Sequence, residues 1–163
     1  MRFESKNKLY SLGIDVGTTG VRTAVIDHQR ECISHARVTL EGIGKTATKN
    51  AENWWLAVRK CIAKQAFKLK KISVKLKDVG YVTVSGTSGT IVLVDKSLTP
   101  VTRPLMYDAV GFQIEAESIL RESPQQDHIS VGSNTVLARA LKLQSEDVHK
   151  NAKYLLHQAD FIM

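Results

Sequence analysis

The chain has 163 residues, which is roughly the length of one domain and enough for a sizeable hydrophobic core. Apolar residues make up 43% of it and charged residues 24%, with only three prolines and ten glycines, values that exclude collagen-like and low-complexity chains. The formal net charge of +7 raises the question of a nucleic-acid partner.

Seven lysines between residues 60 and 77 supply much of this positive charge. They alternate with apolar residues at nearly helical spacing, so we interpret them as the solvated face of an amphipathic element. No aromatic platform for stacking bases accompanies them, and we therefore expect no nucleic-acid partner. The seven are Lys60, Lys64, Lys68, Lys70, Lys71, Lys75 and Lys77.

The N-terminal segment MRFESKNKLYS is charged and has neither an apolar h-region nor a cleavage site of small residues. No window of the chain holds about 18 consecutive apolar residues, so we expect a cytoplasmic protein without a membrane partner. Cys32 and Cys61 have neither CxxC spacing nor histidine partners. We interpret them as ordinary buried or half-buried thiols of a reducing compartment rather than as zinc ligands.

The first elements in chain order are short strands. Residues 9–14 and 21–27 are apolar runs separated by a turn from Gly17 to Gly20, a pattern typical of a β-hairpin. Residues 32–40 alternate roughly between polar and apolar side chains and predict a third strand, which would extend the hairpin into a meander.

A long helix is expected next, because Asn50 is a suitable N-cap and apolar side chains recur at helical spacing from there. Residues 79–84 then predict a parallel strand, and the loop SGTSG leads into a second β-rich run, TIVLVD, that ends at a turn from Ser97 to Pro100. We interpret both tryptophans of the helix as packing residues. The apolar positions of the helix are Trp54, Trp55, Val58, Ile62, Ala66 and Leu69.

Beyond Asp108 the pattern predicts a helix up to a break from Pro124 to Asp127, and a shorter helix over 135–143. The final run, YLLHQADFIM, has no terminating signal, as if the chain were cut inside an element. The order β-β-β-α-β followed by further helices and strands predicts an α/β layer fold without an internal repeat. The apolar side of the helix after Asp108 comprises Ile114, Ile119 and Leu120.

The segment GIDVGTTG at residues 13–20 contains groups that could bind a ligand. A glycine-containing turn exposes successive backbone N–H groups, Gly17 allows a bulky anion to approach, and Thr18 and Thr19 add hydroxyl donors, a combination suited to phosphate. A carboxylate beside phosphates would repel them unless a divalent cation lay between, so Asp15 is predicted to anchor Mg²⁺ through water. The alternative is an Asx-type hairpin in which Asp15 only accepts hydrogen bonds from its own turn.

A second phosphate motif, EGIGKTA at residues 41–47, contains the GKT that ends a Walker A loop. The first glycine of that motif would have to stand at residue 39, which is Thr39, and no apolar helix begins directly after Thr46. We therefore interpret Lys45 as a loop lysine.

The ordered set DVGTTG, NWW, SGTSGTIVLVD and RPLMYD resembles the N-terminal part of the FGGY family of carbohydrate kinases, from about Leu9 to Met163. Pentulose kinases are the most similar members. The loop looks more like that of the D-ribulose kinases (ribulokinases) than that of the xylulose kinases, which usually carry a Met-His pair where this chain has Ser88 and Gly89.

By this resemblance, residues 1–163 are the N-terminal part of an FGGY kinase domain, truncated and without the second domain. The implied fold is α/β and ribonuclease H-like, that of an actin-like ATPase or sugar kinase, with a mixed sheet and flanking helices, here incomplete. The family's general base, an aspartate that deprotonates the sugar hydroxyl, is expected beyond Met163, as are the adenosine-binding motifs. We therefore expect no catalytic residue in this chain.

Carried over residue by residue, the resemblance implies that Asp15 binds magnesium near the phosphates and that Gly17, Thr18 and Thr19 form the nucleotide phosphate hairpin. A second set of residues is expected to bind the sugar. Met106 stands where many members have tryptophan, and the arginine that commonly follows the aspartate is missing, which leaves the identity of the sugar open. The implied substrate-binding residues are Thr87, Ser88, Gly89, Thr90 and Asp108.

The full-length protein is thus expected to phosphorylate a ketopentose, D-ribulose or D-xylulose, with ATP and Mg²⁺ as cofactors and the sugar and ATP as partners. We expect the 163-residue chain alone to be inactive, because it would lack the base and half of the nucleotide site. Marginal stability or self-association, for example as a homodimer, is also expected of it. The alternative is a non-catalytic actin-like remnant that binds a nucleotide or a protein partner.

Overall fold

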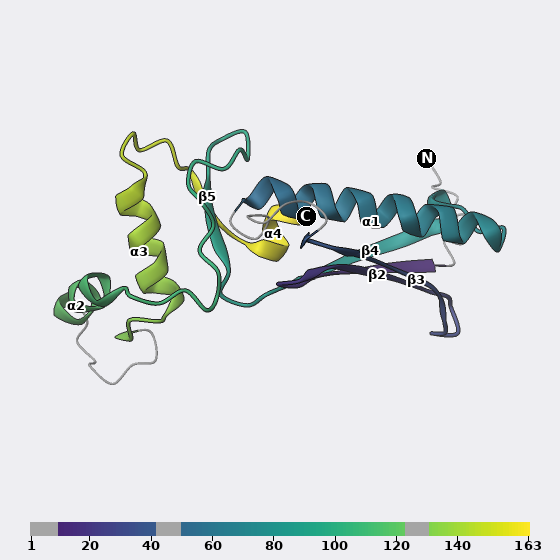
Figure 1. Cartoon of the computed structure of the whole chain (residues 1–163), viewed down its shortest axis with the longest axis horizontal. Helices are drawn as coiled ribbons and strands as arrows, with labels where there is room; N and C mark the ends of the chain where they lie inside the picture. The colour runs from purple at the N-terminus through teal and green to yellow at the C-terminus, as the bar shows by residue number, and fades with distance from the viewer. Residues whose placement is uncertain (1–9, 42–49, 123–130) are drawn as a thin grey trace, which may run out of the picture. The chain divides into compact units, whose positions relative to one another are not determined.

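The computed structural model of the chain describes residues 10–41, 50–122 and 131–163. These residues fall into two compact units. Unit 1 comprises Met1–Lys45 and Asn53–Ser85, and unit 2 comprises Thr46–Glu52 and Gly86–Met163. In Figure 1, unit 1 contains the long helix and the larger sheet, and unit 2 contains the smaller strands and the remaining helices.

Unit 1 is built on a four-stranded sheet with the order β3-β2-β1-β4. The antiparallel pairing of β1 with β2 and of β2 with β3 confirms the predicted hairpin and meander. Buried residues alternate along β1 and β2, as expected of strands with one covered face. The strands are β1 (Tyr10–Val16), β2 (Gly20–Ile26), β3 (Cys32–Thr39) and β4 (Val79–Gly86), and a short 3-10 helix, η3 (Leu76–Asp78), precedes β4.

Helix α1 (Ala51–Lys71) lies along one face of this sheet (Figure 1). It begins after Asn50, whose side-chain oxygen accepts a hydrogen bond from the Glu52 N–H at 2.9 Å, so the predicted N-cap is confirmed. Trp54 is fully buried, as expected of a packing residue, whereas the side chain of Trp55 is 45% exposed. The prediction that both tryptophans pack inside was therefore wrong for Trp55, because adjacent positions of a helix point in different directions.

Two of the seven lysines have a structural role on this helix. Lys64 Nζ donates to the carbonyl oxygen of Arg37 at 3.1 Å, and Lys68 Nζ donates to that of His35 at 2.8 Å. Both carbonyls belong to β3, which is an edge strand of the sheet. The lysines thus occupy acceptors that an edge strand would otherwise present to another chain.

Unit 2 contains an antiparallel pair of short strands, β5 (Ile91–Val94) and β6 (Tyr154–His157). Every residue of β5 is buried, and the strand contributes to a hydrophobic core shared with the helices. The helices are α2 (Gln113–Glu122), α3 (Val136–Glu146) and α4 (Gln158–Ile162). The core residues are Ile91, Leu93, Leu105, Phe112, Ile119, Ala138 and Leu143.

Two further expectations need correction. Of the three apolar residues expected on one side of α2, Ile119 is buried, whereas Ile114 and Leu120 are exposed, so the covered face is narrower than the pattern predicted. Cys61 is buried but Cys32 is exposed, because it begins the edge strand β3.

The GKT of residues 44–46, with Lys45, and the break from Pro124 to Asp127 lie outside the described residues. None of the helices within the described ranges is long and apolar enough to cross a membrane.

Candidate functional site

The turn between β1 and β2 is held by main-chain contacts. Gly17 N donates to the carbonyl of Gly20 at 2.9 Å, and Leu40 N, just after β3, donates to the carbonyl of Thr19 at 3.0 Å. A Cβ atom on Gly20 would lie only 2.3 Å from the carbonyl oxygen of Val38, so the close approach of β2 and β3 requires glycine at this position. The backbone of the turn is therefore set by the strand ladder.

This geometry modifies the expected phosphate cradle. The N–H of Gly17 is used inside the turn and is not an outward-facing donor. The hydroxyls of Thr18 and Thr19, in contrast, make no side-chain hydrogen bond to any other described residue, and Thr19 is exposed. These hydroxyls can donate to an anion.

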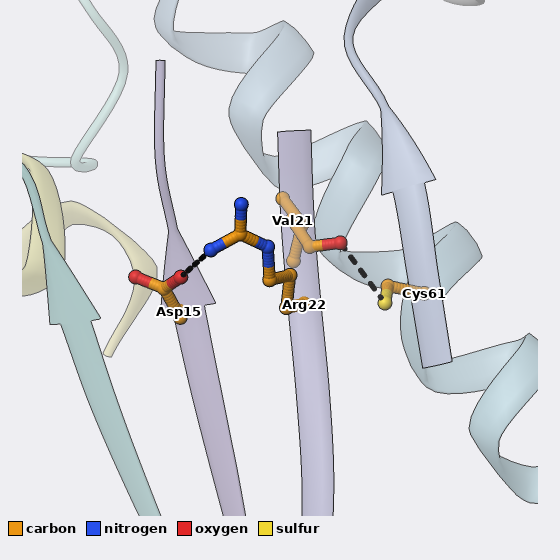
Figure 2. A network of polar contacts seen from close by, with 4 residues as sticks. All are labelled: Asp15, Val21, Arg22 and Cys61. Atoms are coloured by element: carbon orange, nitrogen blue, oxygen red, sulfur yellow. Dashed lines mark hydrogen bonds and ion pairs between the residues drawn. The ribbon is translucent and has the colours of Figure 1, made fainter. Parts of the chain in front are cut away.

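Asp15 lies on β1 directly opposite Arg22 on β2. In Figure 2 the Arg22 side chain extends toward Asp15, with 3.4 Å between Nη1 and Oδ2, while Cys61 of α1 lies against the Val21 carbonyl. About half of the Asp15 side chain is exposed, so this pair contributes less than about 1 kcal/mol. Among the described residues, Asp15 accepts from Arg22 and not from its own turn, which excludes the Asx-type alternative.

The sheet face that carries Asp15 and Arg22 points away from α1. The Thr23 hydroxyl on β2 donates to the side-chain oxygen of Gln65 on α1 at 3.0 Å, so Thr23 faces the helix. Its neighbour Arg22 therefore projects from the opposite face of the sheet, together with Asp15. A hollow of about 480 Å³ lies over this part of unit 1. Besides Asp15, its lining includes three cationic or titratable side chains and three hydroxyl residues, which are Arg22, His35, Arg37, Thr23, Thr83 and Ser85.

The accessible Asp15 carboxylate fits a hydrated magnesium ion that is bound to phosphates. The described residues contain no cluster of three histidine, cysteine, aspartate or glutamate side chains that could enclose a metal. Mg²⁺ usually keeps several waters and uses one or two carboxylates together with substrate phosphates, which a single accessible carboxylate such as Asp15 can satisfy.

In unit 2 the loop after β4 is held by side chains. Gly89 has a φ of +77°, a conformation that favours glycine, and Thr90 is buried. The Thr90 hydroxyl lies 2.8 Å from that of Thr87 and accepts a hydrogen bond from the Tyr107 N–H at 3.1 Å. Thr90 therefore connects the loop to the turn that precedes Asp108, and its hydroxyl is engaged inside the unit.

Gln158, at the start of α4, is a member of this site that sequence reasoning missed. Its side-chain oxygen accepts from the Thr87 N–H at 2.8 Å and lies 2.7 Å from the Thr87 hydroxyl. Gln158 is buried. No local pattern marks it, since it stands between a strand and a helix 71 residues beyond its partner.

Arg139 of α3 is the second residue that was missed. Its guanidinium donates to the carbonyl oxygens of Tyr107 and Asn134, each at 2.8 Å, although only 4% of the residue is exposed. Burial lowers the pKa of the guanidinium, and the negative charge of Asp108 opposes that shift. A sequence signal did exist, because Arg139 lies four residues before the core residue Leu143 and so shares the buried face of α3.

A shallow groove of about 690 Å³ borders this site. Ser88 and Gly89 line it together with Arg139 and the first turns of α3. The predicted sugar-binding residues Thr87, Ser88, Gly89, Thr90 and Asp108 all belong to unit 2, whereas Asp15 and the hairpin residues Gly17, Thr18 and Thr19 belong to unit 1.

Residues 10–137 match the N-terminal domain of the FGGY family of carbohydrate kinases. Solved structures with a similar fold include a "xyloylose kinase" from Brucella ovis, with 17% identity and a TM-score of 0.75. A xylulose kinase from Rhodospirillum rubrum has 16% identity and a TM-score of 0.72, and a glycerol kinase from Plasmodium falciparum with ADP has 8% identity and a TM-score of 0.71.

Each of these alignments covers 94% of this chain but 33% of the other chain, so the sequence spans about a third of the length of these proteins. At these identities the likeness shows the fold. It is the actin-like ATPase fold of the FGGY sugar kinases, present here as part of a domain with a mixed sheet and flanking helices.

Proposed function

Because the chain belongs to the FGGY family of carbohydrate kinases, we propose that the full-length protein transfers the γ-phosphoryl group of ATP to a hydroxyl of a ketopentose, D-ribulose or D-xylulose. Xylulose kinases among the structurally similar proteins support a pentulose, and the glycerol kinase with ADP supports an adenine nucleotide. In this proposal, residues 1–163 are the N-terminal part of the kinase, which acts in the cytoplasm on small molecules rather than on nucleic acid or membranes.

The observation that carries the proposal is the hairpin between β1 and β2. Its Thr18 and Thr19 hydroxyls have no side-chain partner in the described part of the chain, and Asp15, in the last residues of β1 before the turn, is about half exposed. Mg²⁺ bound to ATP supplies charge neutralisation of the transferred phosphoryl group. Asp15 would hold that ion through water, and the threonines would orient phosphate oxygens.

On the sugar side, unit 2 supplies polar groups for a polyol. We propose that Thr87, Ser88, Gly89, Thr90 and Asp108 form this subsite, with Asp108 accepting hydrogen bonds from sugar hydroxyls. The burial of Thr90 suits a supporting position, and the exposed side of the loop at Ser88 suits direct contact. Phosphoryl transfer depends mainly on positioning and charge neutralisation, and the general base would come from residues after Met163.

The test is a kinase assay on the full-length protein with D-ribulose, D-xylulose, glycerol and gluconate, in which ADP release is measured. We expect turnover of a ketopentose and a loss of about 100-fold or more in kcat/KM for Asp15→Asn. Glu117→Gln, which removes an exposed carboxylate on α2, is the matched control and should retain full activity. Preference for glycerol or gluconate would overturn the assignment of a ketopentose as the substrate. Absence of turnover with all four compounds would overturn the proposal that the protein is a kinase of these sugars and polyols.

Turnover by the full-length protein separates the kinase from the non-catalytic remnant, and the 163-residue chain alone tests where the general base lies. We expect it to release no ADP, and to bind Mg²⁺-ATP weakly through Asp15, as measured by calorimetry against the Asp15→Asn variant. Sugar phosphorylation by the pure fragment would show that the base is not beyond Met163. Sedimentation of the same sample tests the expected self-association, including a homodimer.

A further inference from the structure

Arg139 is a cation in an unusual place. It lies on α3, in the interior of unit 2, between two core residues of the same helix, Ala138 and Leu143. A buried charge is costly unless it is paired and hydrogen-bonded. Within the described part of the chain, no carboxylate lies within ion-pair distance of its guanidinium, and its Nε has no hydrogen-bond partner.

The hydrogen bonds that Arg139 does make go to two main-chain carbonyls. One belongs to Asn134, just before the N-cap of its own helix, and the other belongs to Tyr107, 32 residues away along the chain. The Tyr107 carbonyl is part of the peptide bond to Asp108. Its orientation therefore places the Asp108 Cα and, together with the φ of Asp108, sets the direction in which the Asp108 side chain leaves the backbone.

The same turn is held from its other side. Tyr107 N donates to the Thr90 hydroxyl at 3.1 Å, and Ala109 N donates to the Met106 carbonyl at 3.0 Å. Arg139 thus completes a set of contacts that spans Met106 to Ala109.

We propose that Arg139 is a positioning residue for substrate recognition: its buried guanidinium fixes the Tyr107–Asp108 peptide so that the Asp108 carboxylate faces the sugar. This inference rests on the proposed function for the identity of the ligand, but the geometry that it asserts belongs to unit 2 alone. Arg139 acts through Asp108 and does not touch the sugar itself.

The first test compares Arg139→Met with Leu143→Ala in the full-length protein. Leu143 lies on the same helix and is fully buried in the core, so its truncation controls for lost stability. We expect Arg139→Met to raise the KM for the sugar about tenfold or more while the KM for ATP changes little, and Leu143→Ala to change neither. Arg139→Lys, which keeps the charge but offers a single donor group, should restore the sugar KM only in part.

A double-mutant cycle separates positioning from a general structural role. In an Asp108→Ala background, Arg139→Met should have little further effect on the KM for the sugar, because the group through which it acts is already absent. Independent, multiplying effects of the two substitutions would overturn the proposal. An Arg139→Met variant whose sugar KM matches that of the wild type would overturn it as well.

Amide hydrogen exchange makes the inference testable without turnover. In Arg139→Met, the N–H groups of Tyr107 and Ala109 should exchange at least about tenfold faster than in Leu143→Ala at matched global stability. Equal exchange in the two variants would overturn the proposal. If the wild type phosphorylates no sugar, the proposed function fails, and the exchange rates alone decide whether Arg139 holds the Asp108 turn.

Discussion

The hairpin of unit 1 and the loop after β4 in unit 2 are held in different ways. In unit 1, the hairpin with Thr18 and Thr19 is fixed by the backbone, through the strand ladder and the contact of Leu40 with Thr19. In unit 2, side chains add to the main-chain contacts of the loop with Thr87 and Thr90, since the Gln158 side chain and the Thr90 hydroxyl also hydrogen-bond there.

This difference determines which substitutions the hairpin and the loop can each tolerate. A ladder depends on register and on room for close approach, so it is sensitive to added volume and indifferent to most side-chain chemistry. A side-chain network depends on a few donors and acceptors, and loss of one leaves a buried partner unsatisfied.

The largest effect is expected from Gly20→Ala in unit 1. The added Cβ would lie 2.3 Å from the Val38 carbonyl oxygen, so β2 and β3 would have to separate. We expect a loss of at least about 3 kcal/mol in unfolding free energy, measured by urea denaturation. Gly13→Ala is the control, because its nearest neighbour would be the Ala24 oxygen at 4.0 Å. Equal losses in the two variants would show that close approach does not limit the hairpin.

Two buried glutamines allow the side-chain network to be tested against a matched position. Gln158→Leu removes the side-chain oxygen that accepts from the Thr87 N–H. Gln65→Leu removes the side-chain oxygen that accepts from the Thr23 hydroxyl of unit 1. Each should cost about 1–3 kcal/mol of unfolding free energy. In the full-length protein, only Gln158→Leu should weaken sugar binding in a calorimetric titration. The same weakening by Gln65→Leu would indicate a general loss of stability instead.

The edge strand of unit 1 should respond more weakly. Replacing Lys64 and Lys68 together by methionine removes their hydrogen bonds to the β3 carbonyls, at a cost of about 1 kcal/mol, and uncovers the strand edge. We expect increased self-association at high protein concentration, measured by sedimentation velocity. A double variant of Lys60 and Lys70, exposed lysines of the same helix, has the same change in charge and should remain unchanged. If the Lys64/Lys68 and Lys60/Lys70 double variants associate to the same extent, the lower net charge, and not the uncovered strand edge, causes the association.

The smallest effect concerns the two thiols. Burial raises the pKa of the Cys61 thiol and shields its sulfur, whereas Cys32 is exposed. At pH 8 we expect iodoacetamide to modify Cys32 in the folded protein and Cys61 only after urea is added, as followed by mass spectrometry. Fast modification of Cys61 without urea would show that the contact between α1 and β2 opens readily.

The local part of the fold could be predicted because its signals are short in range. Two apolar runs on either side of the GTTG turn predicted β1, β2 and their hairpin, a rough alternation predicted β3, and the helical spacing after Asn50 predicted α1. The errors arose where burial depends on what a second element covers. Trp55, Ile114 and Cys32 are exposed although their patterns or residue types favoured the interior.

The sequence by itself therefore determined the order of the elements, the family and the hairpin that carries Asp15, because pairing between neighbours along the chain follows from periodicity and turn chemistry. Only the tertiary structure decided what holds the loop and the Asp108 turn of unit 2. Thr87 with Gln158 and Tyr107 with Arg139 are 71 and 32 residues apart, and no local pattern relates their side chains. A buried hydrogen bond between distant residues exists only once packing has brought both partners out of water.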